Sequence, residues 1–192
     1  MKISLIGLLI LFSFAAWGQT DSLTVEKRKV VYFNNVLAGG LFGESGQESG
    51  LSLSTTHGIR WGRMALGAGV GFDSYLHWKA VPFFGSISVD LARIKQNAFY
   101  FQINAGNSFA EKINRETWLF DYREYGSTMI GTTAGYRINT DKLTLYIAAG
   151  HKFQRVHYSY NPSPWSSEWG GSTFFVEEDM NRFLVQIGFG WH

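Results

Sequence analysis

The chain has 192 residues, 22 of them glycine, no cysteine, and a formal net charge of +2. The absence of cysteine excludes a disulfide framework and a thiolate metal site. The near-neutral charge argues against a nucleic-acid partner, which would need a basic face. No cofactor is expected.

Residues 1–18 are predicted to be a signal peptide. Lys2 gives the positive start, residues 3–16 carry no charge, and Ala16-Trp17-Gly18 places small residues at the two positions that a signal peptidase inspects. The uncharged run is shorter than the ~20 residues that a membrane-spanning helix needs. Residues 19–29 form a polar lead-in, and residues 30–192 are expected to form the folded domain.

From residue 30 onwards, apolar residues recur at every second position, which predicts β-strands with one apolar face. In the first segment Val31, Phe33, Leu37 and Leu41 share that face. Eight segments are expected, at residues 30–43, 51–61, 64–77, 81–93, 99–109, 125–138, 143–157 and 181–192.

The last segment has the clearest alternation. Its other face is small or polar and carries a single charge, Arg182, whereas a strand facing water normally carries more. A strand that is apolar towards lipid and small or polar towards a lumen has this pattern. The apolar face consists of Phe183, Val185, Ile187, Phe189 and Trp191.

The connections between segments alternate in length. Those near residues 61–63, 93–97 and 139–142 are short, and those at 43–50, 110–124 and 158–179 are longer and polar; the stretch 77–80 is short where a long one is expected. Most acidic residues are expected in the long connections, namely Glu44, Glu48, Glu111, Glu116, Asp121, Glu124, Glu168, Glu177, Glu178 and Asp179.

This pattern resembles the small outer-membrane β-barrels of the OmpA/OmpX type and is similar to the generic barrel families of the Bacteroidota. One departure is that His192 follows the final aromatic residue. The resemblance implies an all-β fold, an eight-stranded antiparallel up-and-down transmembrane β-barrel, in the cell outer membrane with residues 19–29 in the periplasm. It does not fix a biochemical task; we expect a structural or surface-interaction role without enzymatic activity.

The resemblance also implies partners: outer-membrane lipid, lipopolysaccharide, and the outer-membrane assembly machinery, which would engage the C-terminal strand. The ligand of the outer loops is not readable. The structural alternative is a soluble secreted lipocalin-like carrier, which would need charges on the outer faces of its strands.

Inward-facing charges are expected to form a polar core, because an eight-stranded barrel is just wide enough for side chains to fill. Near the short turns, Asp90 is predicted to accept hydrogen bonds from Arg60, Arg137 or both. Towards the other end Asp73 faces Lys152, with Arg182 nearby, and Gly67, Gly69 and Gly71 are expected to leave room for these side chains. An ion path or gate is the alternative interpretation.

His157-Tyr158-Ser159 resembles the His-x-Ser of the lipid A 3-O-deacylases, in which His is the base and Ser the nucleophile. The sequence departs from that family because Tyr160 and Asn161 follow the serine, and the acid partner would have to be Glu168 or Glu177. This is a weak catalytic alternative to a protein without enzymatic activity.

Three further groups of residues are singled out by their position: two tryptophans, an acidic run and two histidines. Trp165 and Trp169 are candidates for stacking on a partner from the last long connection. The run Glu177-Glu178-Asp179 is expected to be solvated, with Ca²⁺ or lipid head groups as alternatives. His57 and His151 fall on the apolar side, and a bulge near Gly150 would turn His151 inward instead.

Overall fold

The computed structural model describes residues 30–43, 49–113, 120–140, 142–161 and 173–191. The predicted signal peptide, the lead-in 19–29, Trp165 and Trp169 lie outside the described residues. No helix within the described ranges is long and apolar enough to cross a membrane.

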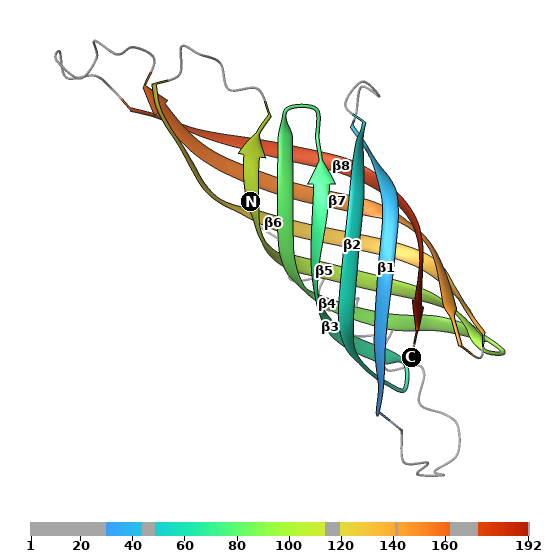
Figure 1. Ribbon diagram of the computed structural model, residues 1–192. Helices are drawn as coiled ribbons and strands as arrows, with labels where there is room; N and C mark the ends of the chain where they lie inside the picture. The colour runs from blue at the N-terminus through green and yellow to red at the C-terminus, as the bar shows by residue number, and fades with distance from the viewer. Residues whose placement is uncertain (1–29, 44–48, 114–119, 141, 162–172, 192) are drawn as a thin grey trace, which may run out of the picture.

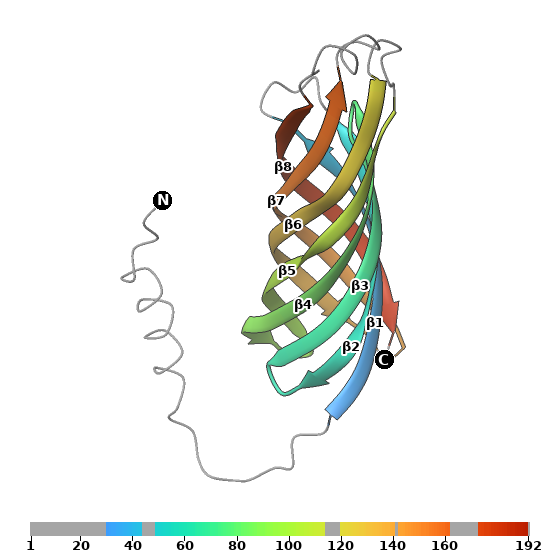
Figure 2. The same cartoon turned by 90° about the vertical axis from the view of Figure 1, so that its left-hand side faces the viewer.

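Eight antiparallel strands pair in chain order, and β1 closes the ring against β8 (Figure 1, Figure 2). The eight-stranded barrel predicted from the sequence is confirmed. The strands are β1 (Val30–Phe42), β2 (Gly50–Trp61), β3 (Met64–Ser74), β4 (Trp78–Ile94), β5 (Asn97–Lys112), β6 (Phe120–Asn139), β7 (Thr144–Asn161) and β8 (Phe174–Trp191). We call the end with the β2–β3, β4–β5 and β6–β7 turns the short-turn end, and the opposite end the long-connection end.

Several strands extend further towards the long-connection end than expected. β7 and β8 have 18 residues each, more than the ~9–11 that a tilted strand needs to cross a membrane. The expectation that most acids lie in the connections was therefore wrong for the ends of β5, β6 and β8, because these strands continue beyond the membrane-spanning length and include acidic residues. The residues concerned are Glu111, Asp121, Glu124, Glu177, Glu178 and Asp179.

The outer surface of the barrel is an apolar belt. Ile187, in the C-terminal half of β8, is 63% exposed, and each of the other strands likewise exposes large aliphatic or aromatic residues. This is the reverse of a soluble barrel, whose apolar residues line the interior. Exposed members of the belt include Leu53, Ile59, Leu66, Ile87, Phe101, Ile103, Ile130, Ile147 and Val185.

Outward aromatic residues gather towards both ends of the barrel, as in the aromatic girdles that flank the apolar band of transmembrane barrels. At the short-turn end the rings of Phe99 and Tyr136 lie 4.6 Å apart, and those of Phe189 and Trp191 lie 6.0 Å apart. At the other end the exposed rings include Phe42, Phe72, Phe109, Tyr125 and Phe175.

The more apolar face of β1 points into the lumen, whereas the pattern of the other strands suggests that it would face lipid. Val31, Phe33, Leu37 and Leu41 do share a face, but it is the inner one, and Val30, Tyr32 and Val36 point outwards. The inner face of β1 is apolar because the side chains that it contacts in the lumen are also apolar or aromatic. Leu41 packs in a cluster with Trp78, Val156 and Met180, and Leu37 packs with Tyr100 and Tyr146.

The inner glycines of β3 make room for apolar groups. A Cβ on Gly69 would lie 2.5 Å from the Phe84 ring, and a Cβ on Gly71 would lie 3.2 Å from Pro82. For Gly69 and Gly71 the expectation that they accommodate long charged side chains was therefore wrong, because β4 presents bulky apolar residues beside them.

Candidate functional site

A buried carboxylate organises the lumen at the short-turn end. Asp90 on β4 is 3% exposed, and Arg137 on β6 is 4% exposed. Arg137 Nη2 donates to Asp90 Oδ2 over 3.0 Å, and Arg93 donates to the same oxygen from Nε and Nη2 over 3.0 and 2.8 Å. Asp90 thus holds two guanidinium groups from different strands.

Arg93 is a member of this cluster that the alternation pattern missed. The register of β4 against β5 shifts between Asp90 and Ala92, and a bulge of this kind turns later residues to the other face. Arg93 therefore lies on the side of Asp90, while Leu91 and Ile94 are both exposed outside. These two apolar residues are three positions apart instead of two or four, and this break in the alternation could have predicted the bulge.

Arg60 on β2 shares this end of the lumen but does not contact Asp90. Its guanidinium lies over the Phe33 ring, 5.2 Å from the centroid, and it has no acidic partner among the described residues. Of the two arginines predicted to flank Asp90, the structure brings only Arg137 to it; Arg93 is its second partner, and Arg60 lies against the Phe33 ring instead.

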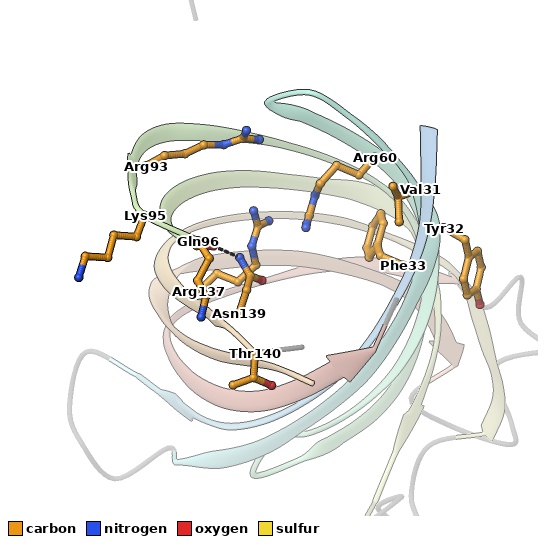
Figure 3. Close-up of a pocket in the computed structure, with 10 residues that line it drawn as sticks. All are labelled: Val31, Tyr32, Phe33, Arg60, Arg93, Lys95, Gln96, Arg137, Asn139 and Thr140. Carbon is orange, nitrogen blue, oxygen red and sulfur yellow. Dashed lines mark hydrogen bonds between the residues drawn. The ribbon is translucent and has the colours of Figure 1, made fainter. Parts of the chain in front are cut away.

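These arginines line a pocket of about 550 Å³ at the short-turn mouth. Figure 3 shows the guanidinium groups of Arg60, Arg93 and Arg137 pointing into the lumen, while Lys95 points away from it. Aromatic and aliphatic groups from β1 form one wall, and polar residues of the turns form the rim. The remaining lining residues are Val31, Tyr32, Phe33, Gln96, Asn139 and Thr140.

A second charge pair lies further from the short turns. Asp73 on β3 is 0% exposed, and Lys152 Nζ on β7 lies 2.5 Å from its Oδ2. Ser52 Oγ donates to Asp73 Oδ1 over 2.7 Å. Arg182, opposite Lys152 in the register of β8, lies over the Tyr75 ring at 5.8 Å.

Gln154 on β7 is the centre of a polar network that sequence reasoning did not identify. The Tyr75 hydroxyl donates to its Oε1 over 3.0 Å. Its Nε2 donates to Ser108 Oγ over 2.8 Å and to Ser127 Oγ over 3.2 Å, and these two hydroxyls also bond to each other. Each strand contributes one uncharged polar side chain to this network. Isolated residues of this kind form no sequence pattern from which the network could be predicted.

Beyond this network, aromatic and apolar side chains fill the lumen. The Tyr158 ring lies 5.5 Å from Trp78 and 5.6 Å from Tyr122, and Val156 and Met180 are buried below them. The cavity found at mid-lumen has a volume of about 20 Å³, close to the ~10–15 Å³ that one water molecule needs. At mid-lumen, therefore, side chains fill the barrel and leave no passage for a solute from one end to the other.

The candidate catalytic residues of β7 are bonded to different partners. His157 Nδ1 lies 3.3 Å from Glu177 Oε1 on β8, so the glutamate considered as an acid partner does reach the histidine. The Ser159 hydroxyl, however, hydrogen-bonds to the Tyr125 hydroxyl at 3.2 Å. No hydrogen bond joins His157 to Ser159 in the described part of the chain.

The acidic run on β8 is paired with β7. Arg155 Nε and Nη2 donate to the two carboxylate oxygens of Asp179 over 2.6 and 2.8 Å, and Arg155 Nη1 lies 3.8 Å from Glu177. Among the residues that the structure describes, no group of His, Asp and Glu could hold a metal ion. Cross-strand ion pairing therefore accounts for Glu177 and Asp179.

Both histidines on the apolar face stay outside. β7 keeps its alternation through Gly150, with His151 exposed and the neighbouring Lys152 buried. On β2, His57 Nδ1 hydrogen-bonds to the Tyr32 hydroxyl at 2.7 Å. Strand seven therefore has no bulge at Gly150.

A closed eight-stranded barrel with an apolar exterior and a polar, side-chain-filled lumen is the fold of the small outer-membrane β-barrels. Neisserial surface protein A matches with a TM-score of 0.57 at 13% identity, over 85% of this chain and 98% of that one. OprG from Pseudomonas aeruginosa matches with a TM-score of 0.52 at 13% identity, over 85% of this chain and 96% of that one. No protein-family model and no curated protein matches the chain.

At 13% identity these similarities establish the fold and no more. The similarity to Bacteroidota barrel families stays a prediction from the sequence.

Proposed function

We propose that this protein resides in the cell outer membrane and has a structural or surface-interaction role, presenting its long connections outside the cell. One observation carries the proposal: large apolar side chains such as Ile187 face outwards, while charged and amide side chains are buried within. Such an exterior is stable only in lipid, because a contiguous apolar belt of this extent is strongly unfavourable in water. A soluble lipocalin-like carrier has the opposite arrangement.

The filled lumen supports a role at the surface rather than transport. Buried pairs and the Gln154 network occupy the interior, and Trp78, Tyr158 and Tyr122 pack across it towards the long-connection end. In this role lipid and lipopolysaccharide are the partners of the belt. The exposed rings of Phe189 and Trp191 at the end of β8 are the segment offered to the assembly machinery.

Membrane residence predicts a defined behaviour on fractionation. The protein is expected in the outer-membrane fraction, and on an electrophoresis gel it should migrate at different positions before and after heating in detergent. The reason is that a closed barrel has no free strand edge from which detergent can unravel it at room temperature. Recovery in the soluble periplasmic fraction would overturn the proposal.

Orientation is testable with single cysteines, because the wild-type chain has none. His77→Cys, between β3 and β4, is expected to react with a membrane-impermeant maleimide on intact cells. Arg63→Cys, in the β2–β3 turn, is expected to react only after the outer membrane is permeabilised, since barrels of this type have short periplasmic turns. Both side chains are exposed, so the reverse result would invert the orientation.

A lipid A-modifying hydrolase is the alternative function, favoured by the contact between His157 and Glu177. We expect no such activity, because the Ser159 hydroxyl bonds to Tyr125 and a nucleophilic serine needs its base within hydrogen-bond reach. Lipid A profiles from cells expressing Ser159→Ala and the wild type should match. An acyl chain removed only by the wild type would establish the hydrolase.

A further inference from the structure

We propose that the pocket at the short-turn mouth binds a phosphate group. The site lies at the opposite end of the barrel from the long connections and goes beyond the surface role proposed above. Arg60 from β2, Arg93 from β4 and Arg137 from β6 direct their guanidinium groups into this pocket (Figure 3). Three strands therefore bring three permanent positive charges to one space.

The charges in the pocket do not balance. Asp90 is the carboxylate that contacts Arg93 and Arg137, so three guanidinium groups and one carboxylate leave a formal charge of +2. Arg60 has an aromatic ring beside it and no acidic partner among the described residues. Like charges held close together repel in a poorly hydrated space, so a bound anion stabilises this arrangement.

An unused hydrogen-bond donor gives independent support for a ligand. Arg137 is 4% exposed, yet its Nε has no hydrogen-bond partner, although its Nη2 is bonded to Asp90. Buried donors are nearly always bonded, because an unmade hydrogen bond costs the full desolvation of the group. Arg137 lines the pocket, so a rotation of its guanidinium towards a bound phosphate would give this donor an acceptor.

The chemistry of the pocket selects phosphate among anions. Guanidinium groups offer planar forks of donors that match phosphate oxygens in pairs. A phosphomonoester carries about −1.5 to −2 charges near pH 7, which offsets the +2 of the pocket. The volume of about 550 Å³ exceeds what the phosphate alone requires, so the group can belong to a larger molecule.

The test is calorimetric titration of the full, folded protein in a phosphate-free sugar detergent, with inorganic phosphate at constant ionic strength. Saturable binding to the wild type is expected. Arg60→Gln should weaken it about tenfold or more, the usual effect of losing a charge-assisted hydrogen bond. Arg60 is the residue to change because it holds no acid, so its removal leaves no buried carboxylate unpaired.

Arg63→Gln is the matched control, because Arg63 is an exposed arginine in the adjacent turn that does not line the pocket. It should bind phosphate like the wild type. Arg60→Lys keeps the positive charge but lacks the planar guanidinium, and it is less disruptive to folding than Arg60→Gln. Its affinity for phosphate should lie between those of the wild type and Arg60→Gln. Absence of saturable binding, or an equal loss in Arg63→Gln and Arg60→Gln, would overturn the proposal, and so would equal binding of chloride.

Two sources of the phosphate group are distinguishable. The titration is repeated with the protein in phosphatidylcholine nanodiscs, with and without phosphatidylglycerol. If phosphatidylglycerol weakens phosphate binding to the wild type but not to Arg60→Gln, a lipid head group enters the pocket. If it has no effect and glycerol phosphate competes, the ligand is soluble; either result supports a phosphate site.

Discussion

Asp90→Ala is expected to lower the free energy of unfolding by about 3–5 kcal/mol, the usual cost of removing one partner from a buried ion pair. Arg137 would lose its charged acceptor while remaining in a site where it is 4% exposed. The nearby guanidinium of Arg60 would then repel it without an intervening carboxylate. Urea-induced unfolding in lipid vesicles, followed by tryptophan fluorescence, measures the change.

A double variant separates the loss of charge balance from the loss of packing. Asp90→Leu combined with Arg137→Met should cost much less than Asp90→Ala, because no charge is left buried without a partner. Arg93→Gln is the control for the exposed contact to Asp90, since the Arg93 side chain is 42% exposed and exposed pairs contribute about 0–1 kcal/mol. Wild-type stability in Asp90→Ala would show that the carboxylate does not organise this end of the lumen.

Lys152→Met is expected to have an effect of similar size, about 3–5 kcal/mol, for the converse reason. Asp73 is fully buried, and without the ammonium group its hydrogen bond from Ser52 would be the remaining polar contact to the carboxylate that the structure records. A charged carboxylate with a single hydroxyl partner pays a large desolvation cost. The same unfolding measurement applies.

The comparison for this pair is a double-mutant cycle with Asp73→Asn. If the pair is coupled, Asp73→Asn combined with Lys152→Met should be more stable than Lys152→Met alone, because the uncompensated charge is gone. Lys79→Met, at an exposed lysine on β4, should change stability by no more than about 0.5 kcal/mol. Additive effects at Asp73 and Lys152 would contradict a direct ion pair.

The architecture was largely readable from the sequence. A period of two places residues on alternate faces of a strand, so the faces of β2 to β8 follow from the order of apolar and polar residues over most of their length. The pairing of Asp73 with Lys152, and of Asp90 with Arg137, followed from the same rule together with distance from the turns. Local periodicity determines these features because hydrogen bonding between strands leaves each side chain one of two directions.

The tertiary structure decided the features in which neighbouring strands override the local pattern. β1 has apolar residues on both faces, and its orientation depends on the fit of Leu41 and Leu37 against Trp78, Val156, Tyr100 and Tyr146 from three other strands.

A one-residue bulge after Asp90 turned Arg93 inwards onto the carboxylate and so added a third arginine to the pocket that Arg60 and Arg137 line. By itself, then, the chain determined an eight-stranded barrel with charged residues inside. Which arginines meet the acid, and which remains available to an anion, depends on a register shift, because shifting a strand by one residue exchanges its two faces.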